Sequence, residues 1–206
     1  MKKITTLFVV NYSEKGSAGT ITEQVRPENF WVFTDEGVSA TQKFDGTASL
    51  IKEGVLYKRY DAKPTKEASK NHIDGTAWNI NDFRQVPDGA IPCQEPDLVT
   101  GHYPHWLPCL RERKEDKYFW EAFDLSSQLE DDSYELCGEK VGSNPENIIG
   151  HQLIRHGSVL CDLEDYSFDG IKQFLLNPEN NIEGIVFHHP DGRMCKIRKS
   201  DFCIKR

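Results

Sequence analysis

The sequence is short of long apolar runs, of basic residues and of paired cysteines, and each shortage argues against a class of protein. No apolar run approaches the length needed to span a bilayer, so a membrane protein is not expected. The 206 residues carry 25 Lys and Arg against 33 Asp and Glu, a formal net charge of −8. That balance argues against a protein that coats nucleic acid by bulk electrostatics, although it leaves room for a local basic groove.

None of the six cysteines forms a CxxC pair; they stand at positions 93, 109, 137, 161, 195 and 203. Cys137 and Cys195 fall inside expected strands, where a disulfide partner would distort the site. We therefore expect reduced thiols and a cytoplasmic protein. A structural zinc site is not expected. Its candidate ligands do not form tight pairs, and prolines separate them; they are His102, His105, Cys93 and Cys109.

The chain does hold a series of short apolar segments and one well-marked helix. Strands are expected at residues 4–10, 30–34, 38–44, 47–52, 54–60, 118–124, 133–137, 184–189 and 193–199, and residues 148–155 begin as loop and become strand. Residues 87–110 hold five of the ten prolines and are expected to form an ordered irregular loop. Ser167 can cap a helix that reaches about Leu176, before Asn177-Pro178 ends it. The predicted fold class is α+β, dominated by antiparallel strands, and the length suits one domain.

Lys43-Phe44-Asp45-Gly46 stands at the junction of two expected strands. A lysine amine is a nucleophile only when it is neutral, and burial or nearby cations favour that form. The Asp45-Gly46 turn would hold the amine at the floor of a pocket. For an isolated KxDG, a β-hairpin with a solvated lysine would be the better interpretation. Here matching segments follow in a fixed order.

Four further motifs complete the series between residues 43 and 199: Tyr57-Lys58-Arg59-Tyr60, Tyr134-Glu135-Leu136-Cys137-Gly138, Glu183-Gly184-Ile185-Val186-Phe187 and Lys196-Ile197-Arg198-Lys199. The series resembles that of the covalent nucleotidyltransferases, which are ATP-dependent RNA and DNA ligases and mRNA capping enzymes. Together the motifs are highly specific and cover most of the chain. The resemblance implies the nucleotidyltransferase (adenylation-domain) fold, with two mainly antiparallel sheets and flanking helices.

The resemblance also implies how the basic motif residues act. Lys43 would attack the α-phosphate of ATP, expel pyrophosphate and hold AMP through a phosphoramidate bond. Lys196 would supply positive charge at that phosphate and help to keep Lys43 neutral. Arg198, two residues further on, points to the same face of the strand and stands where the family usually has a second lysine. Lys199 points the opposite way and is the weaker candidate.

The remaining motif residues would hold the nucleotide. Glu183 precedes an apolar strand and suits Mg²⁺ or Mn²⁺, which take oxygen ligands; the alternative is a solvated acid. Glu135 would accept hydrogen bonds from the ribose hydroxyls, and Glu139 is its rival for that role. Arg59 would contact the ribose or an incoming 5′-phosphate. Gln42, the neighbour of the lysine, would help to recognise adenine.

Two features of the pocket stay open. Relatives often stack adenine on an aromatic residue from the strand after the third motif, but here residues 151–156 contain no Phe, Tyr or Trp. His151 or an aliphatic residue would substitute. His188 and His189 alternate across a strand, so at most one of them faces the pocket, and a surface histidine is the ordinary interpretation of each.

Two basic stretches adjoin motif segments and could line a groove, although a solvated face is the default for any run of charges. They are Lys58, Arg59, Lys63, Lys66 and Lys70, and Lys196, Arg198, Lys199, Lys205 and Arg206.

Further segments resemble small single-domain RNA ligases, which join a 5′-phosphate to a 3′-hydroxyl. These segments are Glu36-Gly37-Val38, Thr100-Gly101-His102, Asn144-Pro145-Glu146, and His188 with Pro190-Asp191-Gly192. DNA ligases and capping enzymes carry a C-terminal oligonucleotide-binding (OB-fold) domain with a sixth motif. This sequence stops seven residues after Lys199, so we expect one adenylation domain over residues 1–206 without an OB-fold domain.

The resemblance therefore implies an ATP-dependent RNA ligase. Lys43 is adenylylated, AMP moves to an RNA 5′-phosphate, and a 3′-hydroxyl displaces AMP. ATP is the expected cosubstrate with Mg²⁺ or Mn²⁺, RNA the expected partner, and a monomer the expected state. Two alternatives remain open: a nucleotidyltransferase acting on DNA nicks or another acceptor, and a non-catalytic module that binds nucleotides or RNA ends.

Overall fold

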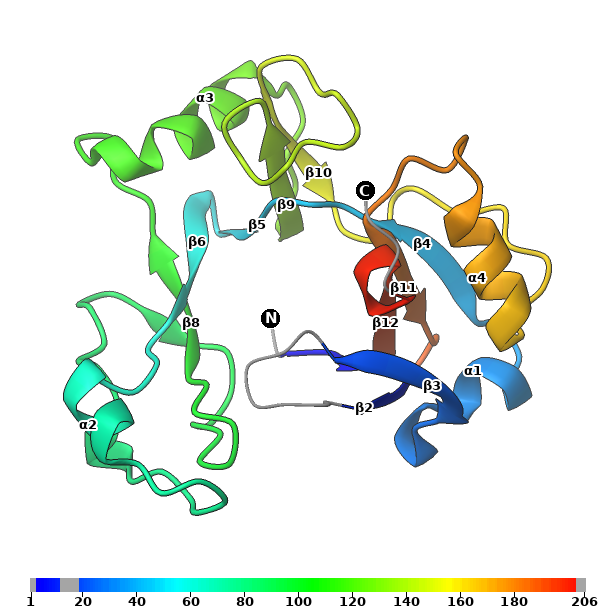
Figure 1. The fold of residues 1–206 in the computed structure, drawn as a ribbon. Coiled ribbons are helices and arrows are strands. Elements are labelled where there is room, and N and C mark those ends of the chain that lie inside the picture. The colour runs from blue at the N-terminus through cyan, green and yellow to red at the C-terminus, as the bar shows by residue number, and fades with distance from the viewer. Residues whose placement is uncertain (1–2, 12–18, 203–206) are drawn as a thin grey trace. The chain divides into compact units, whose positions relative to one another are not determined.

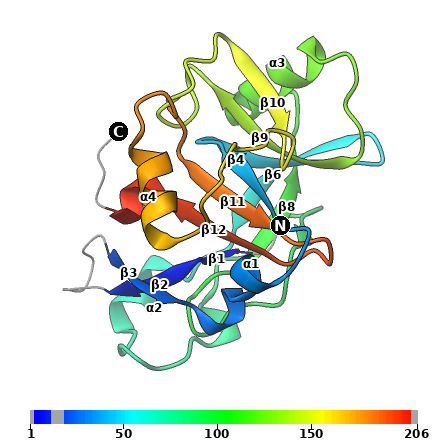
Figure 2. The same ribbon diagram turned by 90° about the vertical axis from the view of Figure 1, so that its right-hand side faces the viewer.

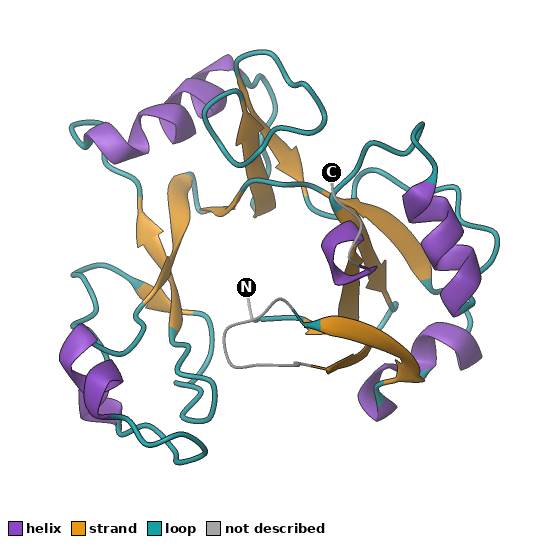
Figure 3. Ribbon diagram, in the orientation of Figure 1, coloured by secondary structure: helices purple, strands orange, loops and turns teal. Residues whose placement is uncertain are grey.

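The computed structural model describes residues 3–11 and 19–202, and its elements form an α+β fold made mainly of antiparallel strands (Figure 1). The predicted fold class is confirmed. Helices are short, and strands and loops make up most of the chain (Figure 3). In the part of the chain that the structure describes, no helix has the length and apolar character needed to cross a membrane. Cys203, Lys205 and Arg206 lie outside the described residues.

The chain forms two compact units, each assembled from separate segments. Among the described residues, the first unit holds 47–136 and 150–154 together with Lys3, and the second holds 4–11, 19–46, 137–149 and 155–202.

The second unit is built on a four-stranded sheet with the order β1-β12-β11-β4. Strands β1 and β12 run parallel, and the other neighbours run antiparallel. The strands of the unit are β1 (Thr5–Thr6), β2 (Phe8–Asn11), β3 (Thr20–Val25), β4 (Ser39–Lys43), β11 (Gly184–His188) and β12 (Met194–Arg198). Its helices are η1 (Pro27–Asn29), α1 (Trp31–Thr34), α4 (Phe168–Leu176) and η4 (Lys199–Phe202). Strands β2 and β3 pair with each other as a separate sheet.

One face of the four-stranded sheet is apolar, and α4 lies against it (Figures 1 and 2). Alternate residues of β11 and β12 on this face are fully buried, among them Ile185 and Ile197. They share one core cluster with Ile171 and Leu175 of α4, which are four residues apart and lie on one side of the helix. As predicted, Ser167 caps α4: its side chain accepts a hydrogen bond of 3.1 Å from the N–H of Gly170.

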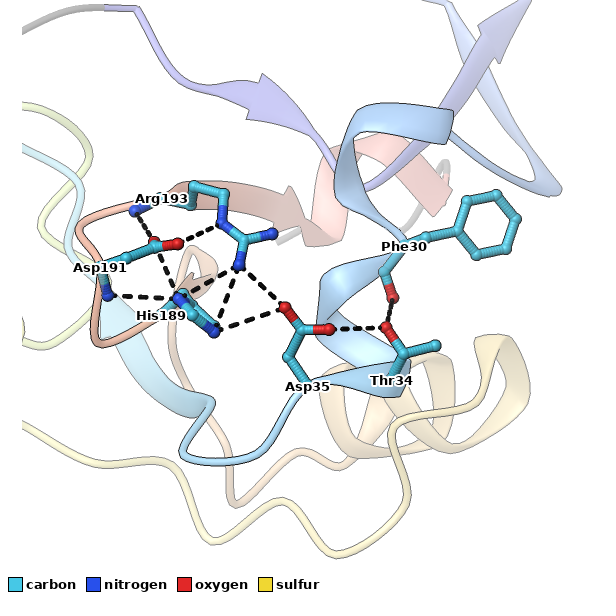
Figure 4. Close-up of polar contacts among 6 residues, drawn as sticks. All are labelled: Phe30, Thr34, Asp35, His189, Asp191 and Arg193. Carbon is cyan, nitrogen blue, oxygen red and sulfur yellow. Dashed lines mark hydrogen bonds and ion pairs between the residues drawn. The ribbon is translucent and has the colours of Figure 1, made fainter.

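A polar network ties the end of α1 to the turn between β11 and β12 (Figure 4). The guanidinium of Arg193 lies 2.8 Å from Asp35 and 2.7 Å from Asp191. His189 lies 2.8 Å from Asp191 and packs edge-on against Trp31 of the core. Hydrogen bonds from Arg193, first from its backbone N–H, lower the pKa of Asp191 to about 2. The network places His189 on the α1 side of the sheet.

The first unit is built on a six-stranded sheet with the order β10-β9-β5-β6-β8-β7. Its strands are β5 (Thr47–Lys52), β6 (Val55–Asp61), β7 (Ile91–Pro92), β8 (Pro104–Pro108), β9 (Asp132–Gly138) and β10 (His151–Arg155). Its helices are α2 (Lys66–Asn71), η2 (Ile80–Asp82), η3 (Lys114–Asp116) and α3 (Lys117–Leu125). Strands β5 and β6 form a hairpin, whose turn places Glu53 and Gly54 at positive φ.

Lys58 lies inside this unit and not on a basic surface, because its strand turns it toward the buried face. Register pairs Lys58 with Ser49, which is fully buried and stands between Tyr134 and the β6 strand. The Lys58 ammonium makes a short ion pair with Asp116, a fully buried carboxylate just before α3. Asp116 also accepts a hydrogen bond of 2.8 Å from the N–H of Leu110. The pair satisfies both charges, which removes Lys58 from the predicted basic groove.

Four expected elements differ from the structure. Residues 4–10, predicted as one strand, form β1 and β2, which belong to different sheets. Residues 30–34, predicted as a strand, form the short helix α1, because Pro27 starts a helical turn that Phe30 continues. Residues 118–124, also predicted as a strand, form α3, in which Phe119 and Ala122 are buried at helical spacing. Residues 87–110 are not wholly irregular, since β8 pairs with β6 along Pro104–Pro108.

Candidate active site

The motif lysine and its predicted basic partners lie on one face of the four-stranded sheet. Strand register sets them in three rows across β4, β11 and β12: Lys43, Gly184 and Arg198; Thr41, Val186 and Lys196; Ser39, His188 and Met194. Side chains alternate across a strand, so these rows share one face, opposite to the apolar face that α4 covers. We call it the Lys43 face.

Lys43 is held at the end of β4 by Glu183. Its ammonium donates a short hydrogen bond to Oε2 of Glu183 and a second one, of 3.3 Å, to the carbonyl oxygen of Phe44. The two side chains are only 22% and 9% exposed, so both charges are largely withdrawn from water. The N–H of Lys199 donates to the carbonyl of Glu183 at 3.0 Å, which fixes the backbone of the acid. Removing either partner would leave a partly buried charge unpaired.

Gly184 is required by the close approach of the strands beside this pair. A Cβ atom at Gly184 would lie 2.1 Å from the carbonyl oxygen of Ile197. Glycine therefore lets β11 pack against β12 immediately after Glu183.

Lys196 lies in the second row, on the same face as Lys43. Burial, together with the charges of Lys43 and Arg198, lowers the pKa of Lys196 from its ordinary value near 10.5 to about 8, against the opposing effect of Glu183 and Asp201. The charged form is therefore costly here until an anion arrives. Such a site suits a bound phosphate.

Arg198 and Lys199 have different surroundings. The guanidinium of Arg198 is 40% exposed and lies 2.7 Å from the buried carboxylate of Asp201. Lys199 is buried, and its ammonium donates to the carbonyl oxygen of Asn180 at 2.5 Å. Lys199 is thus committed to a contact within the fold, whereas Arg198 remains on the Lys43 face, a placement that favours Arg198 as the second basic residue of the motif.

The Asp45-Gly46 bend does not close a hairpin, because β4 and β5 belong to different sheets. Asp45 instead holds the loop that follows β9. Its Oδ2 accepts hydrogen bonds of 2.8 Å from the N–H of Ser143 and 2.5 Å from the Ser143 hydroxyl. Gly142, at φ +62°, presses on the same bend, and a Cβ there would lie 2.6 Å from the Asp45 carbonyl oxygen. The loop is therefore fixed against the lysine motif.

Gln42 lies on the other face of β4 from Lys43, since neighbouring residues of a strand alternate. Its amide donates a hydrogen bond of 3.3 Å to Glu146 in the loop after β9. Its predicted contact with adenine stays a prediction.

Arg59 and Glu135 belong to the first unit and share one face of its sheet. Register pairs Glu135 with Ala48 and Arg59 with Trp106, whereas Lys58 and Ser49 point to the buried face. Arg59 therefore lies on the face opposite to Lys58. The rival Glu139 is exposed in the turn after β9.

His151 is 5% exposed and stacks on Tyr118, with ring centroids 4.1 Å apart. Its Nδ1 lies 2.9 Å from Glu121. One face of the imidazole is already covered, so a base could use only the other.

His102 and His105, two of the candidate zinc ligands, make other contacts in the fold. Across residues 3–11 and 19–202, no three His, Cys, Asp or Glu side chains converge as a metal-binding group. His102 pairs with Asp61 at 2.5 Å, and the buried His105 contacts the carbonyl of Tyr103 at 2.8 Å. Burial raises the pKa of Cys109 to about 12.

Three residues of the site were missed from the sequence. Thr41 could have been found, because it stands two residues before Lys43 in a strand and so shares its face. Asp201 and Ser143 carried no local signal, since their contacts with Arg198 and Asp45 depend on how the chain folds back.

Comparison with known proteins points to ligases. The chain is 28% identical to RNA ligase 1 of Danio rerio over 223 aligned residues, which cover 81% of the chain and 68% of that relative. It is 26% identical to RNA ligase 1 of Pongo abelii and 27% identical to that of Rattus norvegicus, over 77% and 78% of the chain and 65% and 66% of those relatives. No protein-family profile matches the chain.

The chain is thus a sequence relative of RNA ligases, and the predicted resemblance is confirmed. The particular relatives that it matches are named RNA ligase 1, and the matched region spans about two thirds of their length.

Proposed function

We propose that this protein is an ATP-dependent RNA ligase that works through a lysyl-AMP intermediate. The observation that carries the proposal is the Lys43–Glu183 pair with Lys196 on the same sheet face, in a relative of proteins named RNA ligase 1. The nucleotidyltransferase fold and a single adenylation domain over residues 1–206 are part of the same proposal.

In the first step, the neutral amine of Lys43 attacks the α-phosphorus of ATP. A bond forms between Nζ and phosphorus, the bond to the β-phosphate oxygen breaks, and pyrophosphate leaves. Oε2 of Glu183 already contacts Nζ and is the acceptor within reach for the lysine proton. The ammonium of Lys196 balances the negative charge of the phosphate. The phosphate in turn favours the protonated form of Lys196. Arg198 adds a cation on the same face.

Glu183 fits a role at a divalent cation. Mg²⁺ is commonly held by one or two carboxylates together with substrate phosphates, so a single acid beside the phosphate site is a sufficient protein donor set. When bound, Mg²⁺ or Mn²⁺ would neutralise charge on the phosphates of ATP.

The second and third steps join RNA ends. AMP passes from Lys43 to the 5′-phosphate of RNA, which forms a pyrophosphate linkage and frees the lysine. A 3′-hydroxyl then attacks that 5′-phosphate, a phosphodiester bond forms, and AMP leaves. In this proposal Arg59 contacts the ribose or the 5′-phosphate, Glu135 binds the ribose hydroxyls, and Gln42 assists at the base.

The test is transfer of label from α-labelled ATP in the presence of Mg²⁺. The wild-type chain should carry label that survives denaturation, and Lys43→Ala should carry none. Lys52→Ala is a matched control, because Lys52 is an exposed lysine on β5. Addition of 5′-phosphorylated RNA should discharge the label and yield joined RNA. Retained label in Lys43→Ala would show that the nucleophile is another residue.

The same experiment separates the alternatives. A module that only binds nucleotides leaves no label after denaturation. An enzyme for DNA nicks or another acceptor forms the label but is discharged by 5′-phosphorylated DNA, or by neither nucleic acid.

A further inference from the structure

A histidine that has no part in the proposed chemistry lies on the Lys43 face. His188 is the last residue of β11, two residues after Val186, and stands in the row next to Thr41, Val186 and Lys196. Its ring leans back toward the lysine end of the sheet, because Nε2 lies 2.9 Å from the hydroxyl of Thr41. His189, the next residue, lies on the α1 side in the network of Figure 4.

The imidazole of His188 is held in one orientation. Thr41 is only 2% exposed, so water has little access to the hydroxyl that contacts His188. A Cβ at Gly157 would lie 3.5 Å from Cε1 of His188, so the glycine backbone passes near the ring edge that holds both nitrogens. Within residues 3–11 and 19–202, Nδ1 of His188 has no hydrogen-bond partner. A fixed ring with one unused nitrogen is positioned to contact a ligand.

The contacts of Thr41 determine which nitrogen carries the proton. The hydroxyl lies 3.3 Å from the carbonyl oxygen of Val186 and 2.9 Å from Nε2 of His188. A carbonyl only accepts, and a hydroxyl has one hydrogen to donate. Both contacts are hydrogen bonds only if Thr41 donates to Val186 and accepts from an Nε2–H. In the neutral ring, Nδ1 then carries a lone pair and is an acceptor.

The neutral ring is the form expected near pH 7. Burial, and then the charge of His156, lower the pKa of His188 below its ordinary value of 6.5. Lys43, Lys196 and Arg198 lie on the same sheet face, where a charge on the ring would add to theirs. The sheet face therefore presents a hydrogen-bond acceptor at His188.

We propose that His188 reads the base of the nucleotide, with Nδ1 accepting a hydrogen bond from the exocyclic amine of adenine. The inference rests on the proposed function, because it takes the α-phosphate to bind at Lys43 and Lys196. Val186 is an apolar, half-buried side chain in the row of Lys196, which lies between the rows of Lys43 and His188, and a flat base can lie on it. Adjacent rows are two residues apart along a strand, about 7 Å, so the nucleotide lies along β11.

The geometry distinguishes the two common purine nucleotides. Adenine presents an amine, which donates, where guanine presents a carbonyl oxygen, which accepts. An acceptor at Nδ1 can accept a hydrogen bond from the adenine amine. With guanine, Nδ1 would face the carbonyl oxygen, and two acceptors repel each other. A site that leaves a polar group of a bound ligand unpaired discriminates strongly against it.

The test compares label transfer to Lys43 from α-labelled ATP and α-labelled GTP. The wild-type chain should prefer ATP, and His188→Ala should lower the ATP-to-GTP ratio about tenfold, the effect of one lost hydrogen bond to the base. His188→Gln should lower it as well, since a rotating amide can accept or donate. Thr41→Val, which frees both ring nitrogens, should lower the ratio while label from ATP persists.

His189→Ala is the matched control, because it removes the neighbouring imidazole on the opposite face. Its ATP-to-GTP ratio should equal that of the wild-type chain. An unchanged ratio in His188→Gln and Thr41→Val, with label from ATP still formed, would overturn the base-reading role alone. Absence of label in the wild-type chain with either nucleotide would instead overturn the proposed function, and the base-reading role with it.

Discussion

Lys43, at the end of β4, and Glu183 form a largely buried ion pair, so the protonation of one depends on that of the other. The ammonium of Lys43 contacts Oε2 of Glu183, and the acid is only 9% exposed. A lysine paired in this way is aimed but not yet reactive, because its amine must lose a proton before it attacks phosphorus. In the proposed reaction Glu183 would take that proton, and a divalent cation held by the same carboxylate would neutralise charge on the phosphates.

Glu183→Gln should therefore separate the orientation of Lys43 from the removal of its proton. The amide keeps the shape of the acid and can accept a hydrogen bond from Lys43, but it cannot take a proton or hold a divalent cation well. We expect label transfer from ATP to fall about 100-fold, in the range of a lost general base. Single-turnover labelling measures it, with Glu179→Gln as a control in the exposed turn after α4. Equal labelling by Glu183→Gln and the wild-type chain would contradict the role of the acid.

The lowered pKa of Lys196 makes the stability of the protein depend on pH, and the direction of the pKa shift sets the sign of that dependence. The folded value is about 8 and the unfolded value is near 10.5, so between these pH values the unfolded chain binds more protons. Stability contributed by this site therefore rises with pH from about 8 to 10.5, and below 8 the folded chain bears the whole cost of a buried ammonium.

Lys196→Met should thus stabilise the protein at pH 7 by roughly 1–2 kcal/mol while abolishing label transfer. The gain should shrink as the pH approaches 10. Urea unfolding midpoints of the two proteins at pH 7 and pH 9.5 measure the difference. A gain that is the same at both pH values would assign the effect to packing and not to the ammonium.

At the scale of elements, helices and strands were predicted correctly where the sequence carries local signals such as caps and turn residues. The helix α4 has a capping serine, an apolar stripe and a terminating Asn-Pro, and both of its ends were predicted correctly. The strands β4, β5, β6, β11 and β12 were also found, because each has turn residues on its flanks. The segments that became α1 and α3 have aromatic and apolar runs without caps, and such runs fit a helix or a strand until packing decides.

In the site too, features with a local sequence signal were predicted and contacts between distant residues were not. The alternation of side chains along a strand predicted different surroundings for Arg198 and Lys199, and their partners do differ: Asp201 for Arg198 and the carbonyl oxygen of Asn180 for Lys199. It could not show that Asp201 would bind Arg198, nor that Asp116 would draw Lys58 into the interior, because both contacts depend on the return of the chain.

The cap of α4 offers a test of one element. Ser167→Ala removes the acceptor for the N–H of Gly170, so the first turn of the helix loses a partner. We expect a loss of about 1 kcal/mol in the free energy of unfolding. Urea titration measures it, and Ser158→Ala is the control, because that exposed hydroxyl donates to the carbonyl of Arg155 and caps no helix. Equal losses in both variants would show that the cap is not responsible.

At the scale of the whole molecule, the chain crosses between its two units several times, so neither unit is one continuous stretch. Of the described residues, 4–11, 19–46, 137–149 and 155–202 make one unit, and residues 47–136 and 150–154 belong to the other. The boundary even falls within β9, which runs from Asp132 to Gly138. Sequence composition could not reveal this arrangement, because no linker-like segment marks the crossings. Because each unit is assembled from several separate chain segments, we expect one cooperative unfolding transition.

Two buried thiols report on the units separately. Cys109 belongs to the first unit and Cys195 to the second, and burial raises the pKa of each to about 12. Since the thiolate is the reactive form, both should resist iodoacetamide at pH 8 until the chain unfolds. A short alkylation pulse at increasing urea, read by mass spectrometry, should show both thiols becoming reactive over the same concentration range. Alkylation of Cys109 at a urea concentration that leaves Cys195 protected would show instead that the six-stranded sheet opens on its own.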